Sequence, residues 1–348
     1  MGHCGDGKMK IGSRVLGGEA PAYIIAEACD NHLGSMQRAR EMVLAAKKSG
    51  CDAVKFQHHL AAEEMLRDVP MSANFSEPLF DFLEKYALTI DQHAELKMLC
   101  ESIGIDYLCT PFSYVAAREL FEIGVTVFKI GSGEMADIPS LERMAEKFSL
   151  PMIISTGMST LKEIDRTYNA LSKYDISLGL LNCVSEYPPL YEDINLGVIP
   201  IMRERYPGAV IGHSDHTPDI YTVFGAVALG AKIIEKHVIL DKTQAGPDQS
   251  VSINFVEMRD LVDGVRKIEL ALGDEKCVHE REKSIRSWAY RSLVTLRHME
   301  AGEIIRASDI WSKRPGTGIP AAERNRIIGK TLRVSVSENQ LLQWSDFE

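Results

Sequence analysis

Two histidines in this sequence have the spacing of residues that can share a metal ion. His216 lies near the end of Val210-Ile-Gly-His-Ser-Asp-His-Thr217, and His237 ends Lys232-Ile-Ile-Glu-Lys-His237. Each stretch is a short apolar strand that becomes polar at its carboxyl end, and residues 220–231 between them are typical of a helix. Parallel neighbouring strands lie about 5 Å apart, so both imidazoles can face one space and bind one cation. The alternative is that both are core histidines with satisfied hydrogen bonds.

Two lysines stand inside otherwise apolar strands. Lys55 lies in Ala53-Val-Lys-Phe-Gln57, and Lys129 lies in Val127-Phe-Lys-Ile-Gly131. A lysine is almost never fully buried without a partner, so the simplest explanation is an ion pair with Glu27, Glu134 or Glu235. The functional explanation is that both ammonium groups converge on a phosphate or carboxylate.

This second explanation indicates a phosphorylated acid as one substrate. The metal ion would then polarise a second, carbonyl-bearing substrate. A different chemistry also stays open, because a barrel lysine can form a Schiff base with a carbonyl compound, as in metal-free aldolases. Lys129 is the candidate for that role, and borohydride trapping with substrate distinguishes the two cases.

The elements that must position these groups follow a repeat of strand, polar terminus and amphipathic helix. Eight such strands are expected, at 23–28, 53–57, 106–110, 127–131, 151–156, 177–183, 210–217 and 232–237. Eight repeats within residues 1–273 predict a (β/α)8 barrel. A doubly wound open sheet is the alternative, but the first strand is followed by Ala28-Cys-Asp-Asn-His32 and not by a glycine-rich dinucleotide loop.

Catalytic groups of such barrels stand at the carboxyl ends of the strands, and every predicted strand delivers polar side chains there. Besides the two lysines and the two histidines, these include Glu27, Gln57, Thr110, Ser132, Glu134, Ser155, Ser185, Tyr187, Ser214, Asp215 and Glu235. The adjacent His58 and His59 should point apart, which favours a place in a loop or sugar pocket over a second metal site.

Three segments lie outside the repeats. Residues 10–21 are expected to form a hairpin lid, and the charge-rich stretch 274–289 is expected to be an exposed linker. Residues 290–348 change to short strands and turns, which predicts a small β-rich domain. A domain of this size has little core of its own, so we expect it to dock on another surface.

Composition limits the classes of partner. The net charge of -10 argues against a nucleic-acid surface. The seven cysteines are odd in number and contain no CxxC pair, as in reduced cytoplasmic proteins. The start of the chain lacks an apolar signal region, and no run approaches 18 apolar residues, so neither export nor a membrane location is expected.

The chain resembles the sialic acid synthases through motifs that occur in order along nearly its whole length. These are Ile24-Ile-Ala-Glu-Ala28, Asn31-His32-x-Gly34-Ser35, Val54-Lys-Phe-Gln57, Thr110-Pro-Phe-Ser113, Lys129-Ile-Gly-Ser-Gly-Glu134, Ser155-Thr-Gly-Met158, Gly212-x-Ser-Asp-His-Thr217, Glu235-Lys-His237 and Gly246-Pro-Asp248. Ile310-Trp311, Lys313-Arg-Pro-Gly316 and Gly329-Lys330 resemble the antifreeze-like (SAF) domain of the bacterial members.

The resemblance implies a cytoplasmic enzyme that joins phosphoenolpyruvate to an N-acyl hexosamine, typically N-acetylmannosamine, and releases phosphate. It implies a divalent metal, usually Mn²⁺ with Mg²⁺ or Co²⁺ as substitutes, held by His216 and His237. Glu27, Lys55 and Lys129 match catalytic positions. The phosphoenolpyruvate site would comprise Lys55, Thr110, Lys129, Ser132, Ser155, Ser185 and Ser214, and the sugar site would comprise Gln57, Glu134, Tyr187, Asp248 and Arg314.

Arg314 carries a further implication of the resemblance. In similar enzymes the antifreeze-like domain swaps across a homodimer and offers this arginine to the N-acyl group in the partner's barrel. The implied product is N-acetylneuraminate, with legionaminate or pseudaminate, made from a di-acetamido trideoxyhexose, as alternatives; the choice is expected to depend on residues 61–88. Related enzymes usually carry glycine at Cys29, which puts the loop beside Glu27 in question. A binding protein with an inert barrel is the non-enzymatic alternative.

Overall fold

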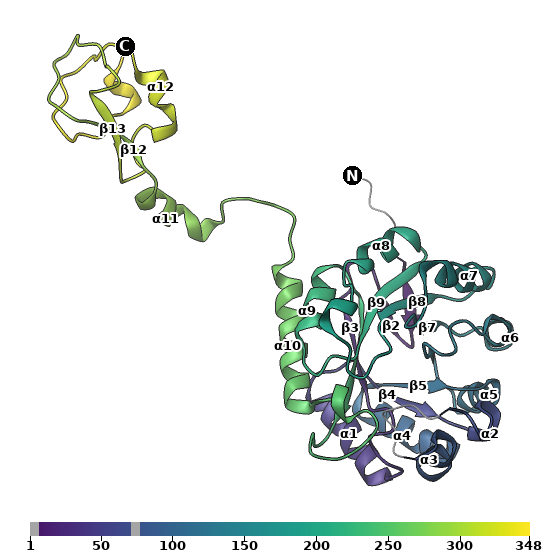
Figure 1. Cartoon of the computed structure of the whole chain (residues 1–348). Helices are drawn as coiled ribbons and strands as arrows, with labels where there is room; N and C mark the ends of the chain where they lie inside the picture. The colour runs from purple at the N-terminus through teal and green to yellow at the C-terminus, as the bar shows by residue number, and fades with distance from the viewer. Residues whose placement is uncertain (1–6, 71–76) are drawn as a thin grey trace. The chain divides into compact units, whose positions relative to one another are not determined.

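The computed structural model describes residues 7–70 and 77–348 of the chain. The chain divides into two compact units, Met1–Leu272 and Gly273–Glu348. Figure 1 shows helices alternating with strands in the larger unit and a small fold with short strands in the second.

Eight parallel strands form the larger unit. They are β3 (Tyr23–Glu27), β4 (Ala53–His58), β5 (Asp106–Pro111), β6 (Phe128–Ile130), β7 (Met152–Ser155), β8 (Leu178–Cys183), β9 (Ala209–Asp215) and β10 (Ile233–Ile239). The hydrogen-bonded order runs β5-β4-β3-β10-β9-β8-β7-β6, and the end strands β5 and β6 approach each other with Cα atoms within 8 Å. The sheet is therefore a nearly closed barrel, as predicted, and not a doubly wound open sheet.

Helices cover the outside of the strands (Figure 1). Those of the barrel unit are α1 (Met36–Lys48), α2 (Ala61–Glu64), α3 (Leu79–Tyr86), α4 (Ile90–Ile103), α5 (Tyr114–Glu122), α6 (Ile138–Phe148), α7 (Leu161–Leu171), α8 (Val198–Arg205), α9 (Tyr221–Ala228) and α10 (Phe255–Ala271). Ser35 caps α1, accepting a hydrogen bond from the Arg38 amide at 3.3 Å. Met42, Val43 and Ala46 of that helix are buried, which fixes the face it turns to the strands.

Alternation along the strands separates two cores. The outward residues pack beneath the helices, while Ile25, Leu108, Ile153 and Ile233 belong to a smaller cluster inside the barrel. Because successive strand residues point to opposite faces, Glu27, Lys55, Lys129 and Glu235 must point into the same interior, nearer the carboxyl ends. The barrel therefore has an apolar lower layer and a polar upper layer.

The expected hairpin at the start of the chain is present, but it is not a lid. β1 (Met9–Ile11) pairs antiparallel with β2 (Arg14–Leu16). Met9, Ile11 and Leu16 are buried in one cluster with Tyr23 and Ala53, which begin their strands. The hairpin therefore fills the amino-terminal end of the barrel, opposite to the predicted site. The apolar residues of the hairpin pack against the apolar layer at the amino-terminal end of the barrel, because the layer at the carboxyl end is polar.

The second unit is small and β-rich. It contains α11 (Glu280–Ala289), β12 (Ser292–Thr295), β13 (Ile310–Lys313) and α12 (Arg324–Ile327). The stretch 274–289 is mostly exposed, and α11 forms its second half. The segments expected as strands around Met299 and Val336 are joined by isolated bridges instead. Ten buried apolar side chains, among them Leu293 and Ile310, form its core.

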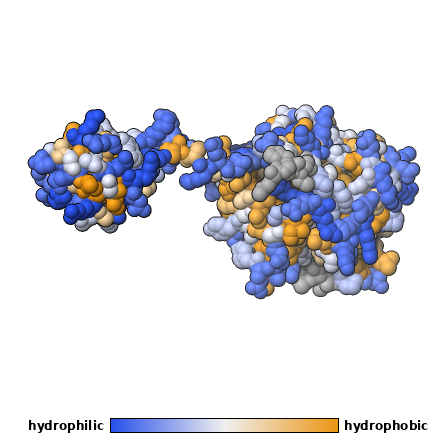
Figure 2. Space-filling model, turned by 90° about the horizontal axis from the view of Figure 1, so that it is seen from above, coloured by the Kyte–Doolittle hydropathy of each residue, from blue (hydrophilic) through white to orange (hydrophobic). Residues whose placement is uncertain are grey.

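The surface carries both polar and apolar residues, as Figure 2 shows for one face. In the second unit Trp288, Trp311 and Trp344 are all more than 40% exposed, and these are the three tryptophans of the chain. Exposed aromatic side chains of this kind are common at protein interfaces. Among the described residues, no helix combines the length and the apolar character that a membrane crossing requires.

Candidate active site

A cavity of about 390 Å³ opens at the carboxyl ends of the barrel strands. All the residues predicted for the site in this unit line it: Glu27, Lys55, Gln57, Thr110, Lys129, Ser132, Glu134, Ser155, Ser185, Tyr187, Ser214, His216, His237 and Asp248. Its volume falls within the range of small-molecule sites. The structure thus brings together side chains that are spread over more than 200 positions of the sequence.

The two lysines meet in the polar layer of the barrel. Lys55 Nζ lies 2.5 Å from Glu27 Oε2 and donates to Thr110 Oγ1 at 3.2 Å. Lys129 Nζ donates to Ser155 Oγ at 2.8 Å. Burial lowers the pKa of Lys55 to about 7, and the neighbouring Lys129 charge adds to that effect. Of the ion pairs considered from the sequence, those with Glu27 and Glu235 are present among the described residues, and none with Glu134 is found.

Glu235 joins the two lysines, as one of the ion pairs considered from the sequence, although no role in the reaction was expected of it. Its Oε1 lies 3.2 Å from Lys55 Nζ and 3.4 Å from Lys129 Nζ, and it accepts from Ser214 Oγ at 3.1 Å. Burial alone would raise its pKa, but the two lysines lower it to about 2. The signal was available, since Glu235 stands two residues before His237 and must share its face of β10.

His216 and His237 form the second group, which lies nearer the mouth of the cavity than the two lysines. Their ring centroids are 5.0 Å apart. His216 Nδ1 lies 2.8 Å from the Val184 carbonyl, so this nitrogen donates and leaves the lone pair on Nε2. Burial lowers the pKa of His216 to about 4 and that of His237 well below its usual value. Both rings are therefore neutral near pH 7, the form that binds metal ions.

The structure supports a metal at these histidines by one further observation. His237 is 4% exposed, and its Nδ1 has no hydrogen-bond partner. A buried polar atom without a partner is costly unless something else satisfies it. A cation between the two rings would do so, and it would match the donor set. The residues present therefore fit a divalent metal.

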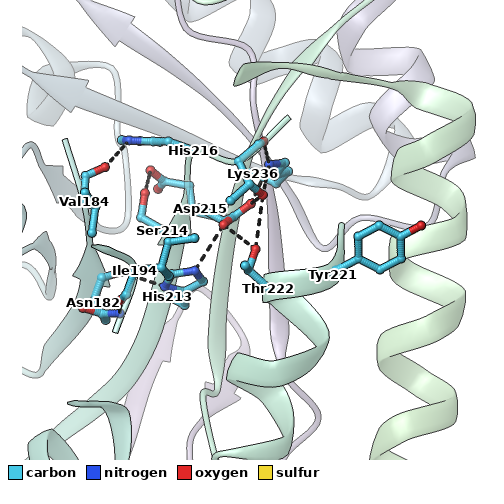
Figure 3. A network of polar contacts seen from close by, with 12 residues as sticks. Asn182, Val184, Ile194, His213, Ser214, Asp215, His216, Tyr221, Thr222 and Lys236 are labelled. Atoms are coloured by element: carbon cyan, nitrogen blue, oxygen red, sulfur yellow. Dashed lines mark hydrogen bonds and ion pairs between the residues drawn. The ribbon is translucent and has the colours of Figure 1, made fainter. Parts of the chain in front are cut away.

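A buried network behind the strands fixes the histidines (Figure 3). Asp215 and Lys236, which precede His216 and His237, point to the outer face of the barrel, where Lys236 Nζ lies 2.5 Å from Asp215 Oδ2. Thr217 and Thr222 donate to the same carboxylate, each at 2.7 Å. Burial alone would raise the pKa of Asp215, but the His213 ring, 3.3 Å from its Oδ1, and the Lys236 charge hold it well below its usual range. Neighbouring strands β9 and β10 are thus tied together at the level of the two rings.

The wider part of the cavity combines polar and apolar groups. Gln57 Nε2 donates to Glu27 Oε1 at 3.2 Å, while burial raises the pKa of Glu134. His59 lines the cavity with its Nε2 3.1 Å from Gln57 Oε1, whereas His58 points away and lies 2.8 Å from Glu119. The two histidines therefore diverge, as predicted.

Leu79 and Leu83 of α3 add apolar surface to this end of the cavity. They belong to the segment 61–88 that was expected to shape the sugar pocket, of which residues 71–76 lie outside the described part of the chain. Sequence reasoning could not single out either leucine, because that segment has no regular period.

Arg314 belongs to the second unit. Its Nε donates to the Ala289 carbonyl at 3.1 Å, and its guanidinium carbon lies 5.3 Å from the Trp288 ring centroid. The side chain is exposed. Its expected contact with a sugar in a partner's barrel stays a prediction.

Fold and site together define a barrel whose cavity holds two lysines beneath a pair of histidines. Comparison with known proteins names the class: residues 42–277 match the NeuB family and residues 290–348 match the SAF domain. The chain belongs to the NeuB family, and it is a phosphoenolpyruvate-dependent nonulosonic acid synthase of the transferase class. Enzymes of this family use a divalent metal.

Individual relatives make different acids. The chain is 36% identical to the N,N'-diacetyllegionaminic acid synthase of Legionella pneumophila, over 97% of this chain and 98% of that one. It is 30% identical to the pseudaminic acid synthase of Campylobacter jejuni, over 97% and 100%. The N-acetylneuraminic acid synthetase structure from Leptospira borgpetersenii, in complex with citrate, matches with a TM-score of 0.72 and 30% identity, over 82% of this chain and 96% of that one.

Proposed function

We propose that this enzyme condenses phosphoenolpyruvate with the open-chain aldehyde of an N-acyl hexosamine, with N-acetylmannosamine as first candidate and N-acetylneuraminate as its product. The observation that supports this most directly is the stacking of two functions in one cavity. Lys55 and Lys129 meet in the lower polar layer, and His216 and His237 meet above them. A phosphorylated acid and a carbonyl compound would therefore lie next to each other.

In this proposal the lower layer binds phosphoenolpyruvate. Lys55 and Lys129 leave Glu235 in part to contact the phosphate and carboxylate, because ammonium groups pair strongly with such oxygens. Thr110, Ser155 and Ser214 already bond to members of this layer and would keep the lysines oriented. Ser132 and Ser185 are proposed to add hydroxyl contacts from the loops after β6 and β8.

Glu27 is proposed to handle the proton of the reaction. As C3 of phosphoenolpyruvate bonds to the aldehyde carbon, water adds at C2 and Glu27 takes one proton of that water. The former aldehyde oxygen gains a proton from solvent to become a hydroxyl, and phosphate leaves as the new C2 hydroxyl loses its remaining proton to give the ketone. Lys55, 2.5 Å from Glu27, keeps the carboxylate ionised and ready to accept it. For this step, the attacking water and C2 of phosphoenolpyruvate must lie on the Glu27 side of the cavity.

The upper layer is proposed to bind the sugar. His216 and His237 would hold a divalent ion, Mn²⁺ in the first place with Mg²⁺ or Co²⁺ as alternatives, and that ion supplies Lewis-acid polarisation of the aldehyde. Gln57, Glu134, Tyr187 and Asp248 line the same end of the cavity and are proposed to contact the sugar hydroxyls and N-acyl group. With the two histidines as its only protein ligands, the ion would be labile, because water or substrate would fill the other positions.

A second candidate is a di-acetamido trideoxyhexose, which would give legionaminate or pseudaminate. A trideoxy sugar of that kind ends in a methyl group, and Leu79 and Leu83 offer apolar surface for it. The 36% identity with the Legionella enzyme over nearly the full length also favours this sugar. The non-phosphorylated form of either sugar is proposed.

The domain arrangement is part of the proposal. We assign residues 1–273 to catalysis, 274–289 to a linker and 290–348 to the SAF domain, and we propose a homodimer in which this domain reaches the partner's barrel. The exposed Trp288 beside Arg314 and the exposed Trp311 support a docking role for the surface of this domain.

Phosphate release from phosphoenolpyruvate with Mn²⁺, measured across a panel of N-acyl hexosamines, tests class and sugar together. Fastest release with N-acetylmannosamine supports the first candidate, and fastest release with a trideoxy sugar supports the second. Absence of turnover with every sugar would contradict the proposal. Borohydride with substrate present should leave Lys129 unmodified, since an imine would indicate aldolase chemistry.

A further inference from the structure

Cys29 lies beside the proposed metal position, at a place where the resemblance leads us to expect glycine. It follows β3 two residues after Glu27 and is fully buried. Its Sγ, one ring nitrogen of His237 and one carboxylate oxygen of Asp248 all lie within 4.8 Å of one another. Thiolate, imidazole and carboxylate are three of the side-chain ligands that transition metals prefer.

Two observations indicate that this cluster holds something. His237 Nδ1 is buried with no hydrogen-bond partner, although a thiol and a carboxyl group stand close to the ring. Cys29 also has a φ of 40°, a left-handed conformation that residues with a side chain rarely adopt and that glycine adopts freely. A side chain kept in such a conformation, pointing at two other ligand groups, is more than a packing residue.

We propose that Cys29 and Asp248 ligate the same ion as His237 and His216, so that this chain binds its metal through sulfur, nitrogen and oxygen together. The inference rests on the proposed metal site at the two histidines and adds two ligands to it. His216 completes the set through its free Nε2, and its ring centroid lies 5.0 Å from that of His237. The ion replaces the thiol proton, which passes to the solvent.

A thiolate in the set changes which metals the site prefers. Sulfur is a soft ligand that favours Zn²⁺ and Co²⁺, whereas carboxylate and water suit Mn²⁺ and Mg²⁺. The enzyme should therefore bind Co²⁺ and Zn²⁺ much more tightly than Mn²⁺, and its bound thiol should resist alkylation. The second oxygen of Asp248 would stay free to accept a hydrogen bond from the sugar.

The test uses the full chain, stripped with chelator and titrated with Co²⁺ without substrates. A sulfur-to-cobalt charge-transfer band in the near ultraviolet is expected, because only thiolate ligation produces it. Cys29→Gly should abolish the band and reduce the preference for Co²⁺ over Mn²⁺. It should also weaken Co²⁺ binding by about 100-fold, which is at the upper end of the loss of affinity when a group that supports a metal site is removed. Glycine suits the backbone at this position, so the variant should fold.

Controls separate this ligand from the other thiols and from the enzymatic proposal. Cys183→Ser, which changes another buried cysteine lining the same cavity, should keep the band. Bound Co²⁺ without the band, or a band that persists in Cys29→Gly, would overturn the inference. Since no substrate is present, an enzyme that turns over but shows no band refutes only the cysteine ligand, while a band without turnover refutes only the proposed reaction.

Discussion

Lys236 Nζ and Asp215 Oδ2 lie 2.5 Å apart on neighbouring strands, and each residue directly precedes one of the two histidines of the proposed metal site. The pair is almost fully buried. Because alternate residues of a strand face opposite ways, an ion pair on the outer face holds two rings on the inner face. The ion pair and the two histidines that it supports thus lie on opposite faces of the same sheet.

Replacing Lys236 with methionine should destabilise the barrel strongly. Removal of one partner leaves Asp215 buried and uncompensated, which typically costs about 3–5 kcal/mol. Lys267→Met removes an ion pair between two exposed side chains and should change the free energy of unfolding by less than about 0.5 kcal/mol. Urea unfolding followed by far-ultraviolet circular dichroism is the measurement, since the tryptophans lie in the second unit and report on that unit. Equal stability of the two variants would contradict a structural role for the pair.

The Lys236→Met variant should also bind metal less tightly, because its histidines lose their support. Isothermal titration with Mn²⁺ at a temperature where the variant is folded measures this. An unchanged affinity would mean that the network stabilises the fold without positioning the rings.

The pH dependence of phosphoenolpyruvate use should reflect Lys55. Its pKa is lowered to about 7, mainly by burial, so the free enzyme loses the ammonium charge as pH rises through about 7. Above that pH the anion meets a neutral amine, and kcat/KM for phosphoenolpyruvate should fall. The profile is measured between pH 6 and 9 in roughly half-unit steps, corrected for the ionisation of the substrate. In Lys55→Met the overall value should drop and this inflection should disappear.

Metal removal should abolish turnover. Dialysis against chelator is expected to reduce phosphate release to background, and Mn²⁺ should restore it, because the proposed ion polarises the aldehyde. His216→Ala should lose metal affinity as well as activity, whereas Ser132→Ala should retain the metal and raise KM for phosphoenolpyruvate. An enzyme that stays fully active after chelation would contradict the assignment of His216 and His237.

Arg314→Ala should raise KM for the sugar far more than KM for phosphoenolpyruvate. Its matched control is Arg324→Ala, which removes another arginine near a tryptophan of the same unit. Equal effects on both substrates would contradict a sugar contact.

Mixing of two defective variants tests the exchange of domains. Arg314→Ala has an intact barrel, and Lys129→Met has an intact second unit. If the SAF domain serves the partner's barrel, refolding equal amounts together should restore about a quarter of wild-type sites through mixed dimers. If each domain serves its own barrel, no activity should return.

Leu16→Ala tests the position of the N-terminal hairpin. Leu16 is 1% exposed within the barrel's lower cluster, so truncation should cost about 2–5 kcal/mol of unfolding free energy. Because the hairpin lies at the end opposite to the site, KM for both substrates should stay unchanged. A change in KM would favour the lid that the sequence alone suggested.

Much of the site could be predicted because barrel strands alternate. Glu235 was already among the ion-pair partners expected for Lys55 and Lys129. Its position two residues before His237 puts both side chains on one face of β10. The ordered motifs predicted the family. The position of each cavity residue at a strand end follows from the same rule.

Other features depend on tertiary contacts that no local pattern encodes. The hairpin 9–16 has too few residues to indicate which end of the barrel it fills. Leu79 and Leu83 reach the cavity from a segment without a period. The contact of Cys29 with Asp248 follows from a left-handed residue in a loop, and propensity does not predict such a conformation where glycine is absent.

The buried hairpin closes the amino-terminal end of the barrel, and this closure affects the order in which ligands bind and leave. Glu235, which contacts both lysines, lies two residues before His237 along β10, roughly 6–7 Å deeper. With the proposed binding sites, the phosphorylated acid would enter before the sugar that covers it, and the released phosphate would leave after the new nine-carbon acid. Steady-state kinetics would then show an ordered sequential mechanism.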